Sequence, residues 1–203
     1  PGVDAAWTVD GDPAGVAVGG GSDLETLPAL ADRTTQRAQN PPRGGTAGDY
    51  EAWAKEASSS VARAWAQTGV ESAGTITIFI VRDDPASPLP DSSLLGTVRT
   101  YVAERAPADV TISVIAPTLV NLDPKMSISP YNEETEAAVD ASLADVVARR
   151  AVPGQTFRRS WITEAISLAT GEIDHAMESP AADFTVTSTQ LVVVGTTSYD
   201  EKI

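Results

Sequence analysis

Residues 40–53, NPPRGGTAGDYEAW, place a helix stop, a turn and a helix start in direct succession. Proline disfavours the α conformation in the residue before it and lacks an N–H, so Pro41-Pro42 ends any preceding helix. Gly44-Gly45 then allows the chain to turn. Thr46 and Asp49 have the spacing of a capping box, in which each side chain accepts a backbone N–H at the first turn of a helix. The stretch therefore predicts a rigid corner between two helices.

The two helices of this corner are predicted over residues 22–39 and 46–57. The first starts with a Ser-x-x-Glu capping box. The second carries Tyr50 and Trp53, which are three residues apart and therefore share one face. These large side chains either join the core of this chain or act as anchors in a contact with another subunit, and both interpretations stay open.

Beyond the corner, hydrophobic periodicity and turn residues predict a mixture of strands and helices. The strands are predicted over residues 61–66, 75–81, 110–115, 119–128, 173–178 and 190–196. The first two strands are expected to form a hairpin, and Pro124 is expected to place the fourth at an edge or to form a bulge. Helices are predicted to start where a polar side chain can accept the first N–H groups, at Asp91 or Ser92, at Asn132 and at Ser160.

The order of these elements predicts an α+β fold with two small α/β sandwich domains in tandem, each a short, mostly antiparallel sheet covered by helices. We place the boundary at Ala116-Pro117, so that the domains comprise residues 22–117 and 118–203. Residues 1–21 are interpreted as the remnant of an upstream domain and a linker. Because the sequence starts at Pro1 and not at methionine, we expect it to be part of a longer protein.

The charge of the chain disfavours two classes of partner. Twenty-eight acidic against 14 basic residues give a formal net charge of −14. Such a surface repels phosphate groups, so we expect neither nucleic-acid binding nor membrane anchoring. No apolar run in the sequence approaches the ~20 residues that span a bilayer. The basic pairs Arg149-Arg150 and Arg158-Arg159 are interpreted as salt-bridge partners rather than as a binding patch.

The residues that usually perform catalysis or bind transition metals are scarce. The chain has no cysteine, which excludes disulfides, thiolate zinc sites and cysteine nucleophiles. Its single histidine, His175, is interpreted as a strand or surface residue. Asp83, Asp84 and Asp91 form the densest group of carboxylates, but their spacing differs from the EF-hand pattern. We therefore expect no catalytic residue, no metal site and no cofactor.

Residues 40–56, NPPRGGTAGDYEAWAKE, resemble the signature of the baseplate J-like family of phage tail proteins. In that signature a helix ends at a proline pair, a Gly-Gly-Thr turn follows, and the next helix carries Asp-Tyr and Trp. The resemblance extends over about residues 20–197, in segments that keep the same order. These segments are 63–65, 79–84, 108–111 with Ala116-Pro117, 153–154, 164–166, 171–175 and 179–183. The sequence departs from the family at 57–60, where ASSS replaces a link containing Pro-Gly, and most of the family's N-terminal part is missing.

The resemblance implies a structural wedge subunit of a contractile-tail baseplate, which acts in assembly and in the rearrangement that triggers contraction. Its implied partners are other wedge and hub proteins and copies of itself in a ring. Its implied location is the tail baseplate of a virion, after synthesis in the cytoplasm of the host bacterium, and it implies no enzymatic activity. The residues marked as a structural signature and possible interface are Asn40, Pro41, Pro42, Arg43, Gly44, Gly45, Thr46, Asp49, Tyr50 and Trp53.

Three other functions are alternatives to this implication. A tailocin or a contractile injection system would use the same wedge, so the sequence does not separate these particles from a phage. A carboxylate-dependent hydrolase of cell-wall glycans would need two convergent acids, which no motif indicates. A carbohydrate-binding module would need a row of exposed aromatic side chains, but the four Trp and four Tyr residues are dispersed.

Overall fold

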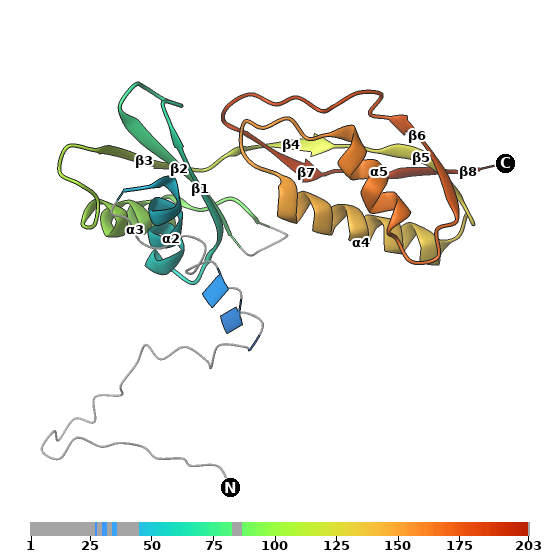
Figure 1. The fold of residues 1–203 in the computed structure, drawn as a ribbon, viewed down its shortest axis with the longest axis horizontal. Coiled ribbons are helices and arrows are strands. Elements are labelled where there is room, and N and C mark those ends of the chain that lie inside the picture. The colour runs from blue at the N-terminus through green and yellow to red at the C-terminus, as the bar shows by residue number, and fades with distance from the viewer. Residues whose placement is uncertain (1–26, 28–29, 32–33, 36–44, 83–86, 203) are drawn as a thin grey trace, which may run out of the picture. The chain divides into compact units, whose positions relative to one another are not determined.

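The computed structural model describes residues 27, 30–31, 34–35, 45–82 and 87–202 (Figure 1). Pro1–Pro41 and Pro42–Ile203 form two separate units, and the second contains nearly all of the described residues. The segment 1–21, the proline pair of the corner and most of the predicted helix 22–39 lie outside the described residues. Within that helix, the described residues 27, 30, 31, 34 and 35 are helical.

The first half of the unit Pro42–Ile203 combines helices with a three-stranded sheet (Figure 1). Its elements are α2 (Ala47–Ala57), β1 (Val61–Thr68), β2 (Thr75–Arg82), α3 (Ser92–Ala103) and β3 (Thr111–Ile115). The sheet order is β1-β2-β3, with β1 antiparallel and β3 parallel to β2. The elements predicted for this region are confirmed, including the hairpin.

The two faces of this sheet have different neighbours, because successive side chains of a strand point to opposite faces. Ile78 and Ile80 of β2 pack with Tyr50 of α2 and Val98 of α3, and the two helices lie side by side over that face (Figure 1). Val81 points to the opposite face and joins the core of the second half. Strand β2 is therefore buried on both faces, which explains its nearly continuous apolar sequence.

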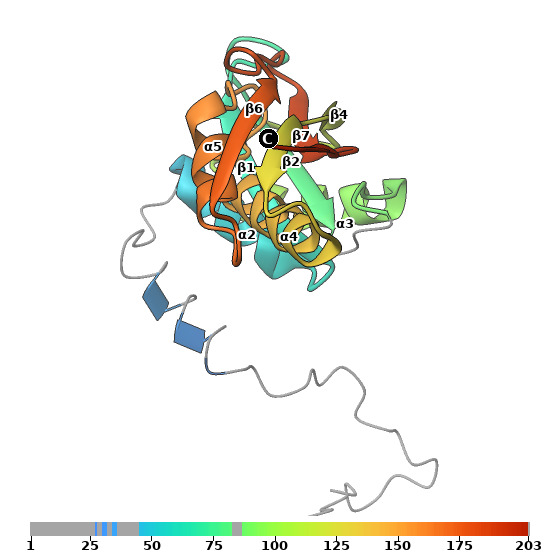
Figure 2. The ribbon, with the colours of Figure 1, turned by 90° about the vertical axis from the view of Figure 1, so that its right-hand side faces the viewer.

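The second half contains two helices and two further sheets in the described residues. Its elements are β4 (Thr118–Leu122), β5 (Lys125–Ser129), α4 (Glu133–Arg150), α5 (Arg159–Ser167), β6 (Asp174–Ser179), β7 (Gln190–Val194) and β8 (Ser198–Glu201). Strands β4 and β7 pair with each other, and the second sheet has the order β6-β5-β8. Figure 2 shows α4 and α5 on the same side of these strands.

The two helices of this half start close to the predicted residues. Asn132 caps α4, because its Oδ1 accepts the Thr135 N–H at 2.9 Å. Helix α5 starts at Arg159, one residue before the prediction, and has no side-chain cap. The buried side chains of both helices meet β4, β5 and β7 in one core, and those of α4 are the predicted Val139, Leu143, Val146 and Val147.

Three expectations about the strands are corrected. The predicted strand 119–128 is two strands, β4 and β5, in different sheets, because Pro124 has no N–H with which to continue a ladder. Strand β8 has no predicted counterpart, since Ser-Tyr-Asp-Glu lacks the apolar alternation of a half-buried strand. The pairing is mixed rather than mostly antiparallel, because β2–β3, β4–β7 and β5–β8 are parallel. The α+β class with helix-covered sheets is confirmed.

Side chains of β1 connect the first sheet to the second half. The Arg63 guanidinium donates to the Ala148 carbonyl oxygen, and the Gln67 amide donates to the Pro153 carbonyl oxygen, both at 2.7 Å. Ala148 lies in the last turn of α4, where carbonyl groups lack helical partners and a cation is favoured. Trp65 lies between these two residues on β1 and packs against the core of the second half. This junction therefore combines two hydrogen bonds with apolar contact.

Thr77 of β2 is a buried polar residue that the fold leaves unpaired. Its side chain is 0% exposed, and its Oγ1 has no hydrogen-bond partner in the part of the chain that the structure describes. A buried hydroxyl without a partner opposes folding, so we expect Thr77→Val to raise the free energy of unfolding by about 1 kcal/mol. Urea denaturation followed by tryptophan fluorescence measures this change.

Thr75 provides the matched control for that substitution. It lies two residues earlier on the same face of β2, is also buried, and its Oγ1 lies 2.7 Å from the Ser72 Oγ. Thr75→Val removes a partnered hydroxyl and is expected to give no gain in the free energy of unfolding. An equal gain from both variants would show that burial of the added methyl group, not the unpaired hydroxyl, determines the effect.

Candidate interaction site

The described part of the corner consists of Gly45, Thr46 and helix α2. The Thr46 hydroxyl accepts the Asp49 N–H at 3.4 Å and donates to the Asp49 Oδ2 at 3.0 Å. The same Oδ2 accepts the N–H groups of Gly45 and Thr46, each at 2.9 Å. The predicted capping box is therefore confirmed, and the buried Asp49 carboxylate lies at the positive end of the helix dipole.

Gly45 adopts a backbone conformation that is unfavourable for other residues. Its φ of 133° lies outside the range that L side chains readily adopt. A Cβ at this position would lie 3.7 Å from the Pro107 Cγ and 3.8 Å from the Tyr50 hydroxyl oxygen. The glycine is thus required by its backbone conformation rather than by a lack of space.

We expect Asp49→Ala to lower the free energy of unfolding by about 2 kcal/mol, because it leaves the donors of Gly45 and Thr46 without this acceptor. Urea denaturation of both proteins measures the loss. The control is Asp91→Ala, which removes the N-cap of α3, where Oδ1 accepts the Leu94 N–H at 2.8 Å. That exposed cap is expected to contribute about 1 kcal/mol. Equal losses would contradict the special role of the Asp49 carboxylate.

The two aromatic residues of α2 have different environments. Tyr50 is 1% exposed and belongs to the core beneath α2 and α3. Burial, together with the nearby charges of Asp49 and Asp109, raises the pKa of Tyr50 above its ordinary value, so the phenol stays neutral. Trp53 is half-buried and meets the Tyr50 ring edge to face, with 5.3 Å between ring centroids. Tyr50 is therefore a core residue, and Trp53 retains an exposed part that a partner can contact.

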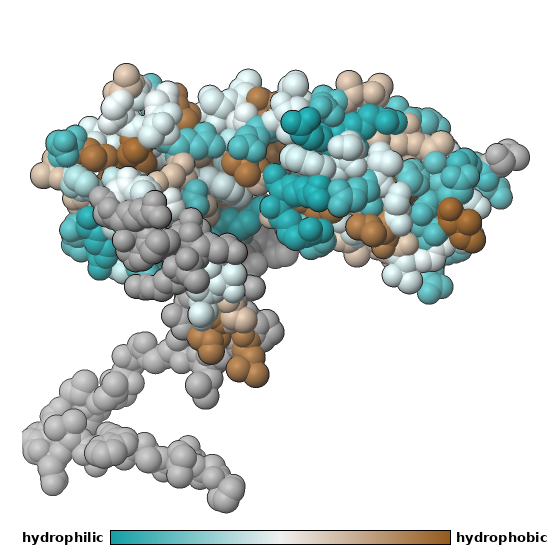
Figure 3. All heavy atoms as spheres, viewed as in Figure 1, coloured by the Kyte–Doolittle hydropathy of each residue, from teal (hydrophilic) through white to brown (hydrophobic). Residues whose placement is uncertain are grey.

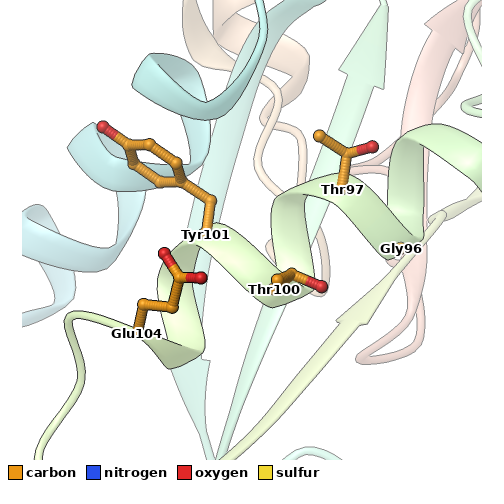
Figure 4. A pocket seen from close by; sticks show the side chains of 5 residues that line it. All are labelled: Gly96, Thr97, Thr100, Tyr101 and Glu104. Carbon is orange, nitrogen blue, oxygen red and sulfur yellow. The ribbon is translucent and has the colours of Figure 1, made fainter.

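Helix α3 carries a shallow hollow on its outer side (Figure 4). The described residues that line it come from this helix and its C-cap: Gly96, Thr97, Thr100, Tyr101 and Glu104. The Arg105 guanidinium lies 3.4 Å from the Tyr101 ring centroid and 3.5 Å from Glu104. The described residues of this hollow therefore include no groups that converge from several directions, as a catalytic pocket requires.

His175 lies on β6, as interpreted from the sequence, and forms an ion pair or hydrogen bond with Glu172. Its Nδ1 lies 2.9 Å from the Glu172 Oε1, and the two side chains are 13% and 6% exposed. Among the described residues, no group of three or more His, Asp or Glu side chains is arranged to hold a metal ion. Asp83 and Asp84 lie outside the described residues.

The basic pairs of the second half contact acids and carbonyl groups of the same chain. Arg149 pairs with Asp145, and Arg150 pairs with Glu164. The Arg159 guanidinium donates to carbonyl oxygens of residues 177 and 180 and thereby holds the loop after β6. The interpretation of Arg149-Arg150 as salt-bridge partners is confirmed, whereas Arg159 binds backbone oxygens instead of an acid.

On the face shown in Figure 3, the described residues are mostly polar, with separate apolar areas. In the second half, the large apolar side chains that are exposed are Tyr131, Leu168 and Ile173. None of the helices that the structure describes has the length and apolar character needed to cross a membrane.

Two family models match this chain in tandem. Residues 42–116 match the model described as the baseplate J-like central domain, and residues 122–200 match that of the baseplate J-like protein C-terminal domain. The chain belongs to the baseplate J-like family. The resemblance inferred from residues 40–56 is therefore confirmed, and so is the tandem arrangement of two domains.

The family's curated members include proteins of phages and prophages. The chain is 33% identical over 181 residues to protein JayE of Escherichia coli K12. The match covers 89% of this chain and 68% of JayE. It is 31% identical to the Mu-like prophage FluMu protein gp47 of Haemophilus influenzae and 29% identical to the baseplate protein gp47 of Escherichia phage Mu. Each of these two matches covers 87% of this chain, which spans only 52% of the length of the gp47 proteins.

A solved assembly shares the fold. A chain in the cryo-EM structure of the anti-feeding prophage baseplate, determined with 6-fold symmetrisation, matches 87% of this chain with a TM-score of 0.52. The match covers 42% of that chain, at 9% sequence identity. At this identity the likeness concerns the fold alone.

The structure brings together only part of the predicted signature. Gly45, Thr46, Asp49, Tyr50 and Trp53 form one continuous corner, whereas Asn40, Pro41, Pro42, Arg43 and Gly44 lie outside the described residues. The exposed turn at Ile173 has no signal in the sequence, because an apolar residue before a strand is ordinarily assigned to the buried face. The Thr-x-x-Asp spacing, in contrast, is a local signal that can be read without tertiary structure, whereas the predicted Ser-x-x-Glu box at Ser22 lies outside the described residues.

Proposed function

We propose that this chain is the central and C-terminal part of a structural baseplate protein in a contractile particle, where it acts as a wedge subunit. The observation that carries this proposal is the ordered match of two baseplate J-like domains across residues 42–200. It is supported by the relationship to gp47 of phage Mu, which is named a baseplate protein. The particle is a phage, a tailocin or a related injection system, since the same wedge serves each.

The geometry suits a subunit that works through binding. The capping box and Gly45 hold α2 against the first sheet, and the junction at Arg63 and Gln67 connects that sheet to the end of α4. Such a connection transmits force between a partner on one domain and a partner on the other. The proposed partners are other wedge and hub proteins and copies of this chain in a ring, in the tail baseplate of the assembled particle.

The proposed role in triggering concerns the same junction. It consists of two side-chain hydrogen bonds to backbone oxygens and the contact of Trp65 and Val81 with the second core. Hydrogen bonds of this kind contribute about 1 kcal/mol each, so a partner that prefers another domain arrangement can exchange them when the particle fires. We propose that the subunit changes its contacts at this step and that it performs no catalysis.

Electron microscopy of the particle tests the proposal. The full-length protein is produced with a small epitope tag in a strain that lacks the untagged gene, and the tag is located with a gold-labelled antibody. We expect the label at the baseplate ring, and we expect particles without the gene to lack a complete baseplate. A label on the tube or sheath away from the ring, or normal baseplates without the gene, would contradict the proposal.

A further inference from the structure

The second half presents three large apolar side chains from two neighbouring connections. Ile173 is 80% exposed, Leu168 is 68% exposed and Tyr131 is 50% exposed. Leu168 and Ile173 belong to the turn between α5 and β6, and Tyr131 belongs to the link between β5 and α4. The two connections lie together, because the Ile173 N–H donates to the Ser129 carbonyl oxygen at 2.9 Å. We call these three residues the apolar tip.

In this turn a charged side chain is buried and an apolar side chain is exposed, the reverse of the usual pattern. The Glu172 side chain is 6% exposed and is held by the His175 ring, with 2.9 Å between Oε1 and Nδ1. The apolar Ile173, which follows directly, points into solvent. A charged residue inside and an isoleucine outside is unfavourable for an isolated domain. Folding of this chain alone therefore gives no reason for the exposure of Ile173.

Hydrogen bonds hold the backbone around the exposed Ile173. Its own N–H is bonded to Ser129, and its neighbour Glu172 is bonded to His175. A backbone that is held before binding loses little conformational freedom when a partner covers its side chain, and this raises affinity. Separate exposed apolar residues are common, but a group that the backbone presents in this way is typical of an interface.

Charge identifies the kind of partner. Glu133 and Glu134 are exposed in the first turn of α4, directly after Tyr131 and Asn132. The tip therefore has an acidic rim beside Tyr131, on a chain with a formal net charge of −14. The cation near Ile173, Lys202, is paired with Asp174. If two copies met tip to tip, these carboxylates would oppose each other. A surface with basic side chains around an apolar pocket is complementary to the tip in charge and in apolar character.

We propose that the apolar tip docks into an apolar pocket with a basic rim on a different subunit of the particle. This inference depends on the proposed baseplate role and adds to it the site and the chemistry of one contact. Ile173 is the central anchor, Leu168 and Tyr131 flank it, and Glu133 with Glu134 pair with the basic rim.

A thiol-labelling experiment tests this docking directly, because these 203 residues contain no cysteine and any cysteine elsewhere in the full-length protein is first replaced by serine. Ile173→Cys is introduced into the full-length protein, and its reaction with a maleimide is compared in the isolated protein and in purified particles. We expect the thiol to react readily in the isolated protein and about tenfold or more slowly in the particle, because the partner excludes solvent. Particles denatured before labelling give the full extent of reaction. Leu89→Cys, at a residue 41% exposed in the first half, is the matched control outside the tip.

The outcomes separate this inference from the proposed function. If the protein is present in the particle and the thiol at 173 reacts there as fast as in the isolated protein, the docking site is wrong while the baseplate role stands. If the protein is absent from the particle, the baseplate role itself fails. A photoreactive cross-linker attached to the same thiol identifies the partner. A product with a second copy of this chain would overturn the assignment to a different subunit, and a product with a different subunit supports it.

A charge reversal tests the rim independently of the thiol. The double variant Glu133→Lys with Glu134→Lys is expected to reduce incorporation into particles about tenfold, because it opposes basic groups on the partner. Its melting temperature, compared with that of the unmodified protein, shows whether the variant is folded. Normal incorporation of the folded variant would contradict an acidic rim that pairs with basic residues.

Discussion

Tyr50→Ala is expected to lower the free energy of unfolding by about 3–5 kcal/mol, the range measured for truncation of large buried aromatic residues. The ring is 1% exposed and lies between helices α2 and α3 and the sheet. Its removal leaves a cavity that the capped helix cannot close, because the Asp49 and Thr46 hydrogen bonds hold the start of α2 in place. Urea denaturation, followed by circular dichroism, measures the loss.

Trp53→Ala is the control in the same helix. Trp53 is half-buried and packs at the edge of that core, so we expect a smaller loss, of about 1–2 kcal/mol. If Trp53 also anchors a partner, this variant will incorporate poorly into particles although it folds. A Tyr50→Ala protein that keeps its stability and only fails to assemble would contradict the assignment of Tyr50 to the core.

Phe157→Ala is expected to cause a loss of similar size, about 3–5 kcal/mol, in the second half. Phe157 is 2% exposed, and its ring meets the Trp161 ring edge to face, with 5.2 Å between centroids. Its backbone N–H and C=O both pair with Phe184, at 2.8 Å each, so the residue joins the start of α5 to the loop after β6. Chemical denaturation again provides the measurement.

Phe184→Ala is the control for this second substitution. Phe184 makes the same backbone bridge, but its side chain is only partly buried against the core. Truncation keeps the bridge and removes less apolar contact, so we expect a loss of about 1–2 kcal/mol. Equal losses at the two positions would show that the bridge itself, and not the buried ring of Phe157, stabilises this region.

The two core variants together report whether the domains unfold as one. Residues 42–203 form one compact unit, and Arg63, Trp65 and Gln67 connect its halves. We expect Tyr50→Ala and Phe157→Ala each to shift a single transition, since a junction with apolar contact couples the two cores. Two separate transitions, one shifted by each variant, would show that the junction is weaker than either core. That result would favour a role for domain rearrangement.

The sequence predicted most of the elements that local chemistry determines. Thr46 with Asp49 and Asn132 each start a helix as predicted, and Asp91 is one of the two predicted caps of α3, because a capping side chain accepts an N–H only three residues away. The β-branched run of β2 and the apolar face of α4 were also predicted from the sequence, since periodicity reflects burial along a single element. The family signature is also local, because it consists of a turn and a cap whose residues are adjacent in the chain.

Only the tertiary structure decided which strands meet and which side chains stay exposed. The division of the predicted strand 119–128 between two sheets, and the parallel partner of β5 near the C-terminus, depend on residues more than 60 positions apart. The same holds for the bond from Arg63 to the end of α4, whose partners are 85 positions apart. The turn that buries Glu172 and exposes Ile173 also depends on a distant residue, because the Ile173 N–H donates to the carbonyl oxygen of Ser129. The corner at Thr46 could therefore be derived from sequence, whereas the apolar tip could not, because its acceptor at Ser129 and its turn at Ile173 come together only in the folded chain.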